Sequence, residues 1–172
     1  MTRPQLPETS NLTTDIPTLA VQIRRLFASG PPNGWLLGWD RDRGFDDLSA
    51  LVAPLAATNN TSFDYAFCNH FEVRLSLAEE RYAVLTVLTS FVADVFSVHW
   101  TVYDPGGQAG RVVGQPPEGK RIEADVRAWL GRRGLRELPD ELLRQPIPGI
   151  ELELSGADDV TLGKCLFRDS AG

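Results

Sequence analysis

The chain has 172 residues, of which 42% are hydrophobic and 23% are charged, a composition that excludes wholesale disorder and a collagen-like fibre. Its 17 Lys and Arg against 23 Asp and Glu give a net charge of −6 and a pI near 4.9, a balance that repels a phosphate backbone, so we expect no nucleic acid ligand. No apolar stretch approaches the roughly 20 residues that span a bilayer. Because the start of the chain also lacks an apolar signal core, we expect a cytoplasmic protein with no membrane contact.

The first part of the chain predicts a tail followed by two helices. Residues 1–14 lack periodicity and are expected to form a flexible N-terminal tail, ahead of a single α+β domain over 15–169. Apolar residues at helical spacing predict a helix over about 16–28 and a second over about 46–57. Pro54 can end the second helix early, because proline lacks the backbone N–H that a helix needs.

Two tryptophans lie between these helices. Trp35, Leu37 and Trp39 alternate with other residues, which predicts a short strand. We expect both tryptophans in the core, and the edge of a binding groove is the alternative position for them.

The middle of the chain predicts an antiparallel three-stranded meander over about 70–103. Apolar and polar residues alternate there with a period of two, as in a half-buried strand, and turn sequences separate the strands. One face of the sheet is expected to pack on the helices and to carry Val73, Leu75, Val98 and Trp100. Arg74 and His99 are expected on the other face, and a one-residue error in register would reverse every assignment.

The last third predicts a helix over about 121–133, on which Glu123 and Arg127 stand one turn apart and are expected to pair on the exposed side. The alternation of Ile150, Leu152 and Leu154, followed by further apolar positions, predicts a C-terminal hairpin. The expected fold is therefore α+β, with helices 16–28, 46–57 and 121–133 packed on one face of the antiparallel sheet. This order of elements resembles that of the secretion-chaperone fold, which implies a chaperone that binds one effector.

No motif in the chain specifies a reaction. Cys68-Asn69-His70 pairs a thiol with an imidazole, but no third partner is implied, and we interpret both residues as structural. Cys68 and Cys165 are expected to be free thiols that are not needed for activity, because isolated cysteines are typical of a reducing compartment. A zinc site would need both histidines, His70 and His99, together with a further ligand, and neither this nor any other cofactor is expected.

The outward face of the meander is the candidate recognition surface. Arg74, His99 and Tyr103 are residue types that protein interfaces favour. Acidic side chains are expected to attract a basic partner over long range, and the candidates are Asp46, Asp47, Glu79 and Glu80. We therefore expect a non-catalytic protein-binding module, typified by an immunity protein that neutralises a basic toxin or by an effector chaperone, with a homodimer left open. The alternative is a small enzyme or ligand-binding domain with a pocket that the sequence does not reveal.

Overall fold

The computed structural model describes residues 15–107 and 110–170, and the expected tail over 1–14 lies outside the described residues. The fold is α+β, with a mostly antiparallel sheet in the order β1-β2-β3-β4-β5, to which β6 adds by pairing in parallel with β4. The strands are β1 (Ala56–Asn59), β2 (Cys68–Ser76), β3 (Tyr82–Ser90), β4 (Val95–Tyr103), β5 (Gly110–Val113) and β6 (Arg136–Glu137). The helices are α1 (Ile16–Leu26), α2 (Gly34–Leu37), α3 (Phe45–Val52), α4 (Lys120–Arg132), α5 (Asp140–Leu143) and α6 (Leu162–Leu166), with a 3₁₀ turn η1 (Pro117–Gly119).

The predicted meander is confirmed as β2, β3 and β4. Val73 lies opposite Leu85, which in turn lies opposite Trp100, so these three side chains form one row across the sheet. Because side chains alternate along a strand, this row fixes the face of every other residue in the meander. The face that α3 and α4 cover carries Val73 and Trp100, together with the partly buried Leu75 and Val98, as the alternation predicts.

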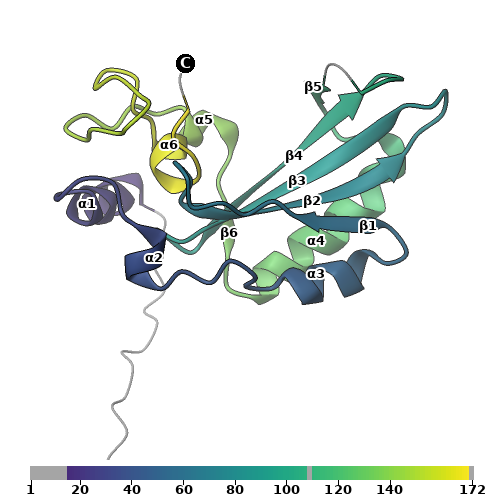
Figure 1. Ribbon diagram of the computed structural model, residues 1–172, viewed down its shortest axis with the longest axis horizontal. Coiled ribbons are helices and arrows are strands. Elements are labelled where there is room, and N and C mark those ends of the chain that lie inside the picture. Colours follow the sequence, from purple (N-terminus) through teal and green to yellow (C-terminus); the bar gives the residue numbers. More distant parts are fainter. Residues whose placement is uncertain (1–14, 108–109, 171–172) are drawn as a thin grey trace, which may run out of the picture.

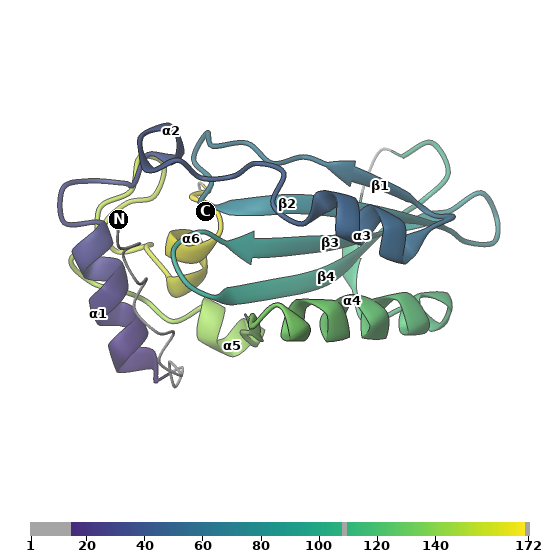
Figure 2. The ribbon, with the colours of Figure 1, turned by 90° about the horizontal axis from the view of Figure 1, so that it is seen from below.

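The helices α3 and α4 pack side by side on that face of the sheet (Figure 2). Leu48 and Val52 of α3 meet Val126 and Leu130 of α4 in one apolar cluster with the strands. The predicted helix over 46–57 ends at Val52, because proline at position 54 disfavours the helical conformation of the residue before it, and Ala53 is extended (ψ 139°). The chain then forms the edge strand β1, which the sequence pattern does not predict.

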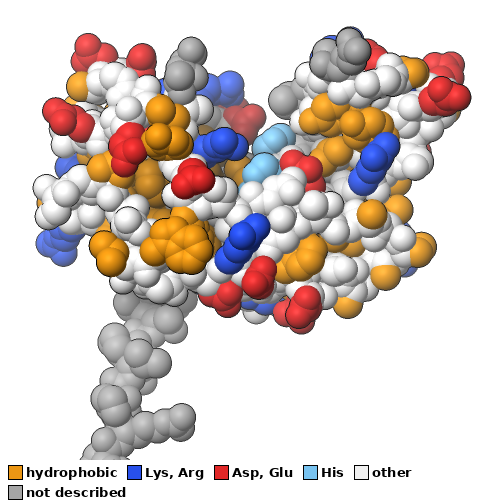
Figure 3. Space-filling model, viewed as in Figure 1, with side chains coloured by type: hydrophobic (Ala, Val, Ile, Leu, Met, Phe, Trp, Pro, Cys, Tyr) orange, Lys and Arg blue, Asp and Glu red, His pale blue; other side chains and the backbone are white. Residues whose placement is uncertain are grey.

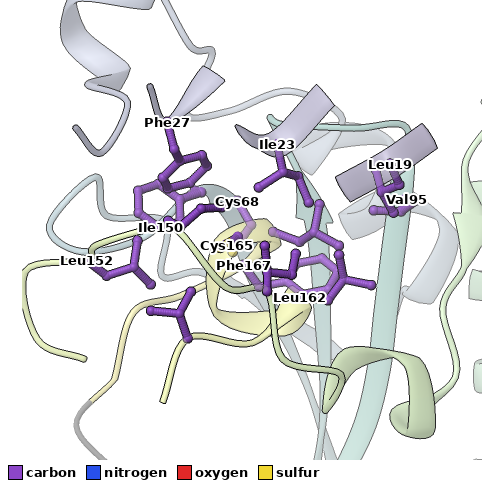
Figure 4. Packing of buried hydrophobic residues seen from close by; sticks show 14 of the residues in the cluster. Leu19, Ile23, Phe27, Cys68, Val95, Ile150, Leu152, Leu162, Cys165 and Phe167 are labelled. Carbon is purple, nitrogen blue, oxygen red and sulfur yellow. The ribbon is translucent and has the colours of Figure 1, made fainter. Parts of the chain in front are cut away.

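A second cluster lies at the end of the sheet away from the β2–β3 turn (Figure 1). It joins α1, α6 and the segment between α5 and α6 to the ends of the strands, as Figure 4 shows for Ile23, Cys68, Ile150 and Cys165. The helix predicted over 16–28 exists as α1, but it packs in this second cluster and not on the sheet face that α3 and α4 cover.

The predicted C-terminal hairpin is wrong. Within the described residues, no strand forms between position 150 and Leu162, where α6 begins. The buried carboxylate of Asp169 accepts hydrogen bonds from the backbone N–H of Leu154 (2.6 Å) and from the hydroxyl of Ser155 (2.6 Å). These bonds hold the segment as a loop from which Ile150 and Leu152 enter the second cluster, while Leu154 stays 44% exposed. The alternation is therefore not that of a paired strand.

The predicted strand over Trp35 to Trp39 is also wrong, because the chain forms the short helix α2. The side chain of Asn33 accepts hydrogen bonds from the N–H groups of Trp35 (3.0 Å) and Leu36 (3.3 Å), which caps the helix at its start. Gly38 ends it in the left-handed conformation (φ 67°) that glycine adopts without strain. Local capping therefore overrides the alternation of apolar residues.

Candidate functional site

The uncovered face of the sheet forms the floor of a cleft of about 330 Å³. Polar side chains of β2, β3 and β4 rise from this floor, and the segment between β1 and β2 supplies one wall. Arg168, which follows α6, lines the cleft from the far end of the sequence. Figure 3 shows the hollow between the sheet and the part of the molecule that contains α6, with the histidine side chains inside it.

A histidine and a carboxylate pair inside the cleft. His70 and Glu72 are two residues apart on β2, so their side chains lie on the same face of the sheet. His70 Nε2 lies 3.1 Å from Glu72 Oε1. Glu72 lies opposite Thr86, and Thr86 lies opposite His99, so the two histidines stand on either side of β3. Burial lowers the pKa of His99 below its usual 6.5, and the nearby His70 adds to this effect, while Asp140 and Glu72 act in the opposite direction.

At the end of this face nearest the β2–β3 turn, an arginine and two tyrosines form a stack. The guanidinium of Arg74 lies 3.9 Å from the ring centroid of Tyr82, which stacks on Tyr103 at 4.8 Å. The structure therefore places Arg74, His99 and Tyr103 on one face, as the sequence predicts, and Tyr82 joins Arg74 to Tyr103. Tyr82 is not among the residues that the sequence predicts for this surface, although its position in the meander register puts it on this face.

The predicted acidic residues do not join this face. Asp46 and Asp47 lie in the first turn of α3, on the opposite side of the sheet, and Asp47 lies 3.2 Å from the guanidinium of Arg133. Glu79 and Glu80 form the β2–β3 turn with positive φ angles of 58° and 56°. The sequence-predicted acidic contributors are thus split between two separate places.

Both cysteines are free and buried, in agreement with the prediction of two free thiols. Burial raises the pKa of the Cys68 thiol to about 12, and it raises that of Cys165 to about 12 as well, so neither side chain is a thiolate at neutral pH. Among the described residues, no group of at least three His, Cys, Asp or Glu side chains is arranged to hold a metal ion.

The second exposed feature is an apolar projection on α2, which we define as Trp35, Leu36 and Leu37. Their exposed fractions are 76%, 86% and 51%, in contrast to the expectation that Trp35 is a core residue. Trp39, by comparison, packs against the second cluster and stacks on Phe91 at 4.8 Å. Hydrophobic side chains gather at the surface over α2 in Figure 3.

Comparison with protein-family models, with curated proteins and with solved structures finds no match to this chain. Among the residues that the structure describes, no helix has the length and apolar character that crossing a membrane requires. Inferences about function therefore depend on the two surfaces described above.

Proposed function

We propose that this chain is a non-catalytic protein-binding module of the cytosol, of the kind represented by an immunity protein or an effector chaperone, and that it binds its partner through the α2 projection. The observation that supports this most is the exposure of three consecutive apolar side chains, led by Leu36 at 86% and Trp35 at 76%. Contiguous apolar surface of this kind is typical of interaction sites, and tryptophan is among the residues that contribute most to binding.

Contacts within the chain support the backbone of the projection and the ring of Trp35. Asn33 caps the helix, and buried Gly34 lies so close to Trp39 that an added Cβ would meet its ring at 2.7 Å. Trp35 contacts Phe63 edge to face, with the ring centroids 4.9 Å apart. A surface that is already ordered loses less conformational entropy on binding, which favours affinity.

Mutation of the projection tests this proposal. Affinity capture from the native host should yield one stoichiometric partner with the wild-type chain, and Leu36→Asp should reduce its capture at least tenfold. Because Leu36 is almost fully exposed, the variant should keep its thermal midpoint. Val21→Asp is the matched control, since Val21 is 45% exposed on α1, and this variant should capture the partner normally. Equal capture by all three chains, or no stoichiometric partner at all, would contradict the proposal.

A basic partner is the chemistry that the net charge of −6 favours, because opposite charge accelerates encounter. With the captured partner in hand, raising the salt so that the Debye length falls from about 30 Å to about 8 Å should lower the association rate much more than it changes the dissociation rate. Asp46, Asp47, Glu79 and Glu80 remain the candidate contributors. An association rate that does not respond to salt would remove the electrostatic part of the proposal and leave the apolar contacts.

A second candidate function is supported by the cleft on the open sheet face. The convergence of His70, Glu72 and His99 in a space of about 330 Å³ is typical of a small-ligand site or a small active site. A small molecule that copurifies with the wild-type chain and is absent from His99→Ala, as shown by mass spectrometry of the extracted protein, would favour this function. If His99→Ala still captures the protein partner, protein binding through the α2 projection is separate from ligand binding in the cleft.

A further inference from the structure

A small pocket lies beside the α2 projection. It holds about 160 Å³, and its walls come from the turn before α2, from the segment that precedes β2, and from the C-terminal part of the chain. Six of its ten described lining residues are aromatic or proline, namely Pro31, Pro32, Trp35, Phe63, Tyr65 and Phe67, and the other four are polar or acidic. The pocket therefore adjoins the apolar projection and shares Trp35 with it.

The charged groups of this pocket are all of one sign. Asp64, Glu153 and Asp169 line it, and none of the described residues that line it is Lys or Arg. The carboxylate of Asp169 already accepts hydrogen bonds from Leu154 and Ser155. The exposed Asp64 and Glu153 are therefore the carboxylates that can pair with a ligand in the pocket. Carboxylates beside aromatic rings favour a cation that is flat and carries several N–H donors.

The volume of the pocket limits the kind of occupant that fits it. A volume of about 160 Å³ is larger than the share of about 30 Å³ that one water molecule takes. It is smaller than the roughly 300 Å³ at which pockets for drug-sized ligands begin, so one side chain fits it better than a whole metabolite. Arginine matches both the volume and the lining, because its guanidinium stacks on aromatic rings and pairs with carboxylates, whereas the compact ammonium of lysine does not stack.

We propose that this pocket receives one arginine side chain from the surface of the protein partner, while Leu36 and Leu37 contact the apolar surface around that arginine. The inference rests on the proposed function, since it names the partner chemistry that the α2 projection recognises. It also explains why Trp35 stands at the surface, because its ring belongs both to the pocket wall and to the projection.

The pocket can be tested without the partner. We would add N-acetyl-arginine amide to ¹⁵N-labelled wild-type chain and follow the indole N–H signal of Trp35, assigned from the spectrum of Trp35→Phe. N-acetyl-citrulline amide is the matched probe, because it has nearly the same shape and no charge, and sodium chloride controls for ionic strength. We expect a saturable shift with the arginine compound at millimolar concentration and none with the citrulline compound. The double variant Asp64→Asn/Glu153→Gln should weaken that binding at least tenfold.

Two results would overturn the inference: equal shifts with both compounds, or no arginine-specific shift at 50 mM. The partner experiment then separates this failure from failure of the proposed function. If Leu36→Asp loses the partner while Asp64→Asn/Glu153→Gln binds it with unchanged affinity, the inference that the pocket binds an arginine of the partner is wrong. The proposed protein-binding function then stands. If the arginine compound binds but no partner depends on Leu36, the pocket is real and the proposed function is wrong.

Discussion

Glu123 is a charged residue that is only 5% exposed, and it connects α4 to the sheet. Its carboxylate accepts a hydrogen bond from the indole N–H of Trp100 at 2.5 Å and pairs with Arg127 one turn along the helix. Arg127 also donates two bonds of 2.8 Å to Glu137. The predicted pairing of Glu123 with Arg127 is thus confirmed, but the expectation that it lies on the exposed side is wrong, because the indole of Trp100 draws the carboxylate into the core.

Removal of this carboxylate should therefore be costly. Glu123→Ala leaves the indole N–H of Trp100 and one bond of Arg127 without a partner, and we expect a loss of about 3 kcal/mol of unfolding free energy. Asp125→Ala is the matched control, because its pair with Arg121 (3.8 Å) lies on the exposed side of the same helix, and it should change stability by less than about 0.5 kcal/mol. Urea unfolding measures both variants, and equal losses would contradict the burial argument.

His99 should make stability depend on pH. Its pKa in the folded chain lies below the 6.5 of the unfolded chain, so on acidification the unfolded state takes up the proton first. The stabilisation that comes from a neutral His99 is complete above pH 6.5 and is lost as the pH falls towards the folded-state pKa. Relative to His99→Gln, the wild-type chain should lose unfolding free energy between pH 7.5 and 5.0, by at most about 1.4 kcal/mol per pH unit. A difference between the two chains that does not change with pH would contradict this prediction.

At the level of elements, the β2–β3 turn carries side chains that do not suit its backbone. Glu79 and Glu80 both have positive φ, and the N–H of Arg81 donates a hydrogen bond across them to the carbonyl oxygen of Ala78 (3.3 Å). Asn-Gly is the pair that hairpin turns prefer where two successive residues have positive φ. A residue other than glycine, asparagine or aspartate in this conformation costs about 1–2 kcal/mol. The presence of two glutamates at this turn is therefore unfavourable for folding.

Replacement of the turn separates conformation from charge. Glu79→Asn with Glu80→Gly should raise the unfolding free energy by about 1–2 kcal/mol, because both residues then adopt positive φ readily, while the greater freedom of glycine in the unfolded chain offsets part of the relieved strain. The control is Glu79→Gln with Glu80→Gln, which removes the same charges but keeps the strain, and it should stay within about 0.5 kcal/mol of the wild-type chain. The denaturant midpoints of the two double variants measure both changes in stability. A gain of the same size in the glutamine variant would assign the effect to charge repulsion.

The long elements could be predicted from the sequence, whereas the short helix α2 and the edge strand β1 could not. The period of two runs through most of β2 and β4, which are nine residues long, and it predicts the shared face of Arg74, His99 and Tyr103. By contrast, α2 has four residues, and its cap at Asn33 and its aromatic support decide its conformation. Arg168 and the segment before β2 reach the cleft only through tertiary packing, so no local pattern could show that the open face is enclosed.

At the scale of the whole molecule, two apolar clusters share the same strands. On β2, Phe71 belongs to the cluster under α3 and α4, and Cys68, three residues earlier, belongs to the cluster around α6. On β4, the adjacent residues Phe96 and Val95 are divided between the two clusters in the same way. Each strand of this pair therefore enters both clusters. If one cluster loses its packing, the parts of β2 and β4 that the other cluster packs against also lose their order. The two clusters should therefore unfold together, as the single domain that the sequence predicts.

Native-state hydrogen exchange tests this coupling. Leu166→Ala opens a cavity in the cluster around α6, where Leu166 is fully buried, and should cost about 3 kcal/mol. If the clusters unfold as one unit, the slowest amides of β3, such as that of Leu85, should lose the same free energy of opening as the amides of α1. Leu130→Ala is the reciprocal variant, because Leu130 is fully buried under the sheet, and it should lower protection in α1 as much as in β3. If each variant lowers protection only in its own cluster, the chain contains two cooperative units. The α2 projection is followed by Trp39, which packs against the cluster around α6, so the projection would then belong to a unit whose order does not depend on α3 and α4.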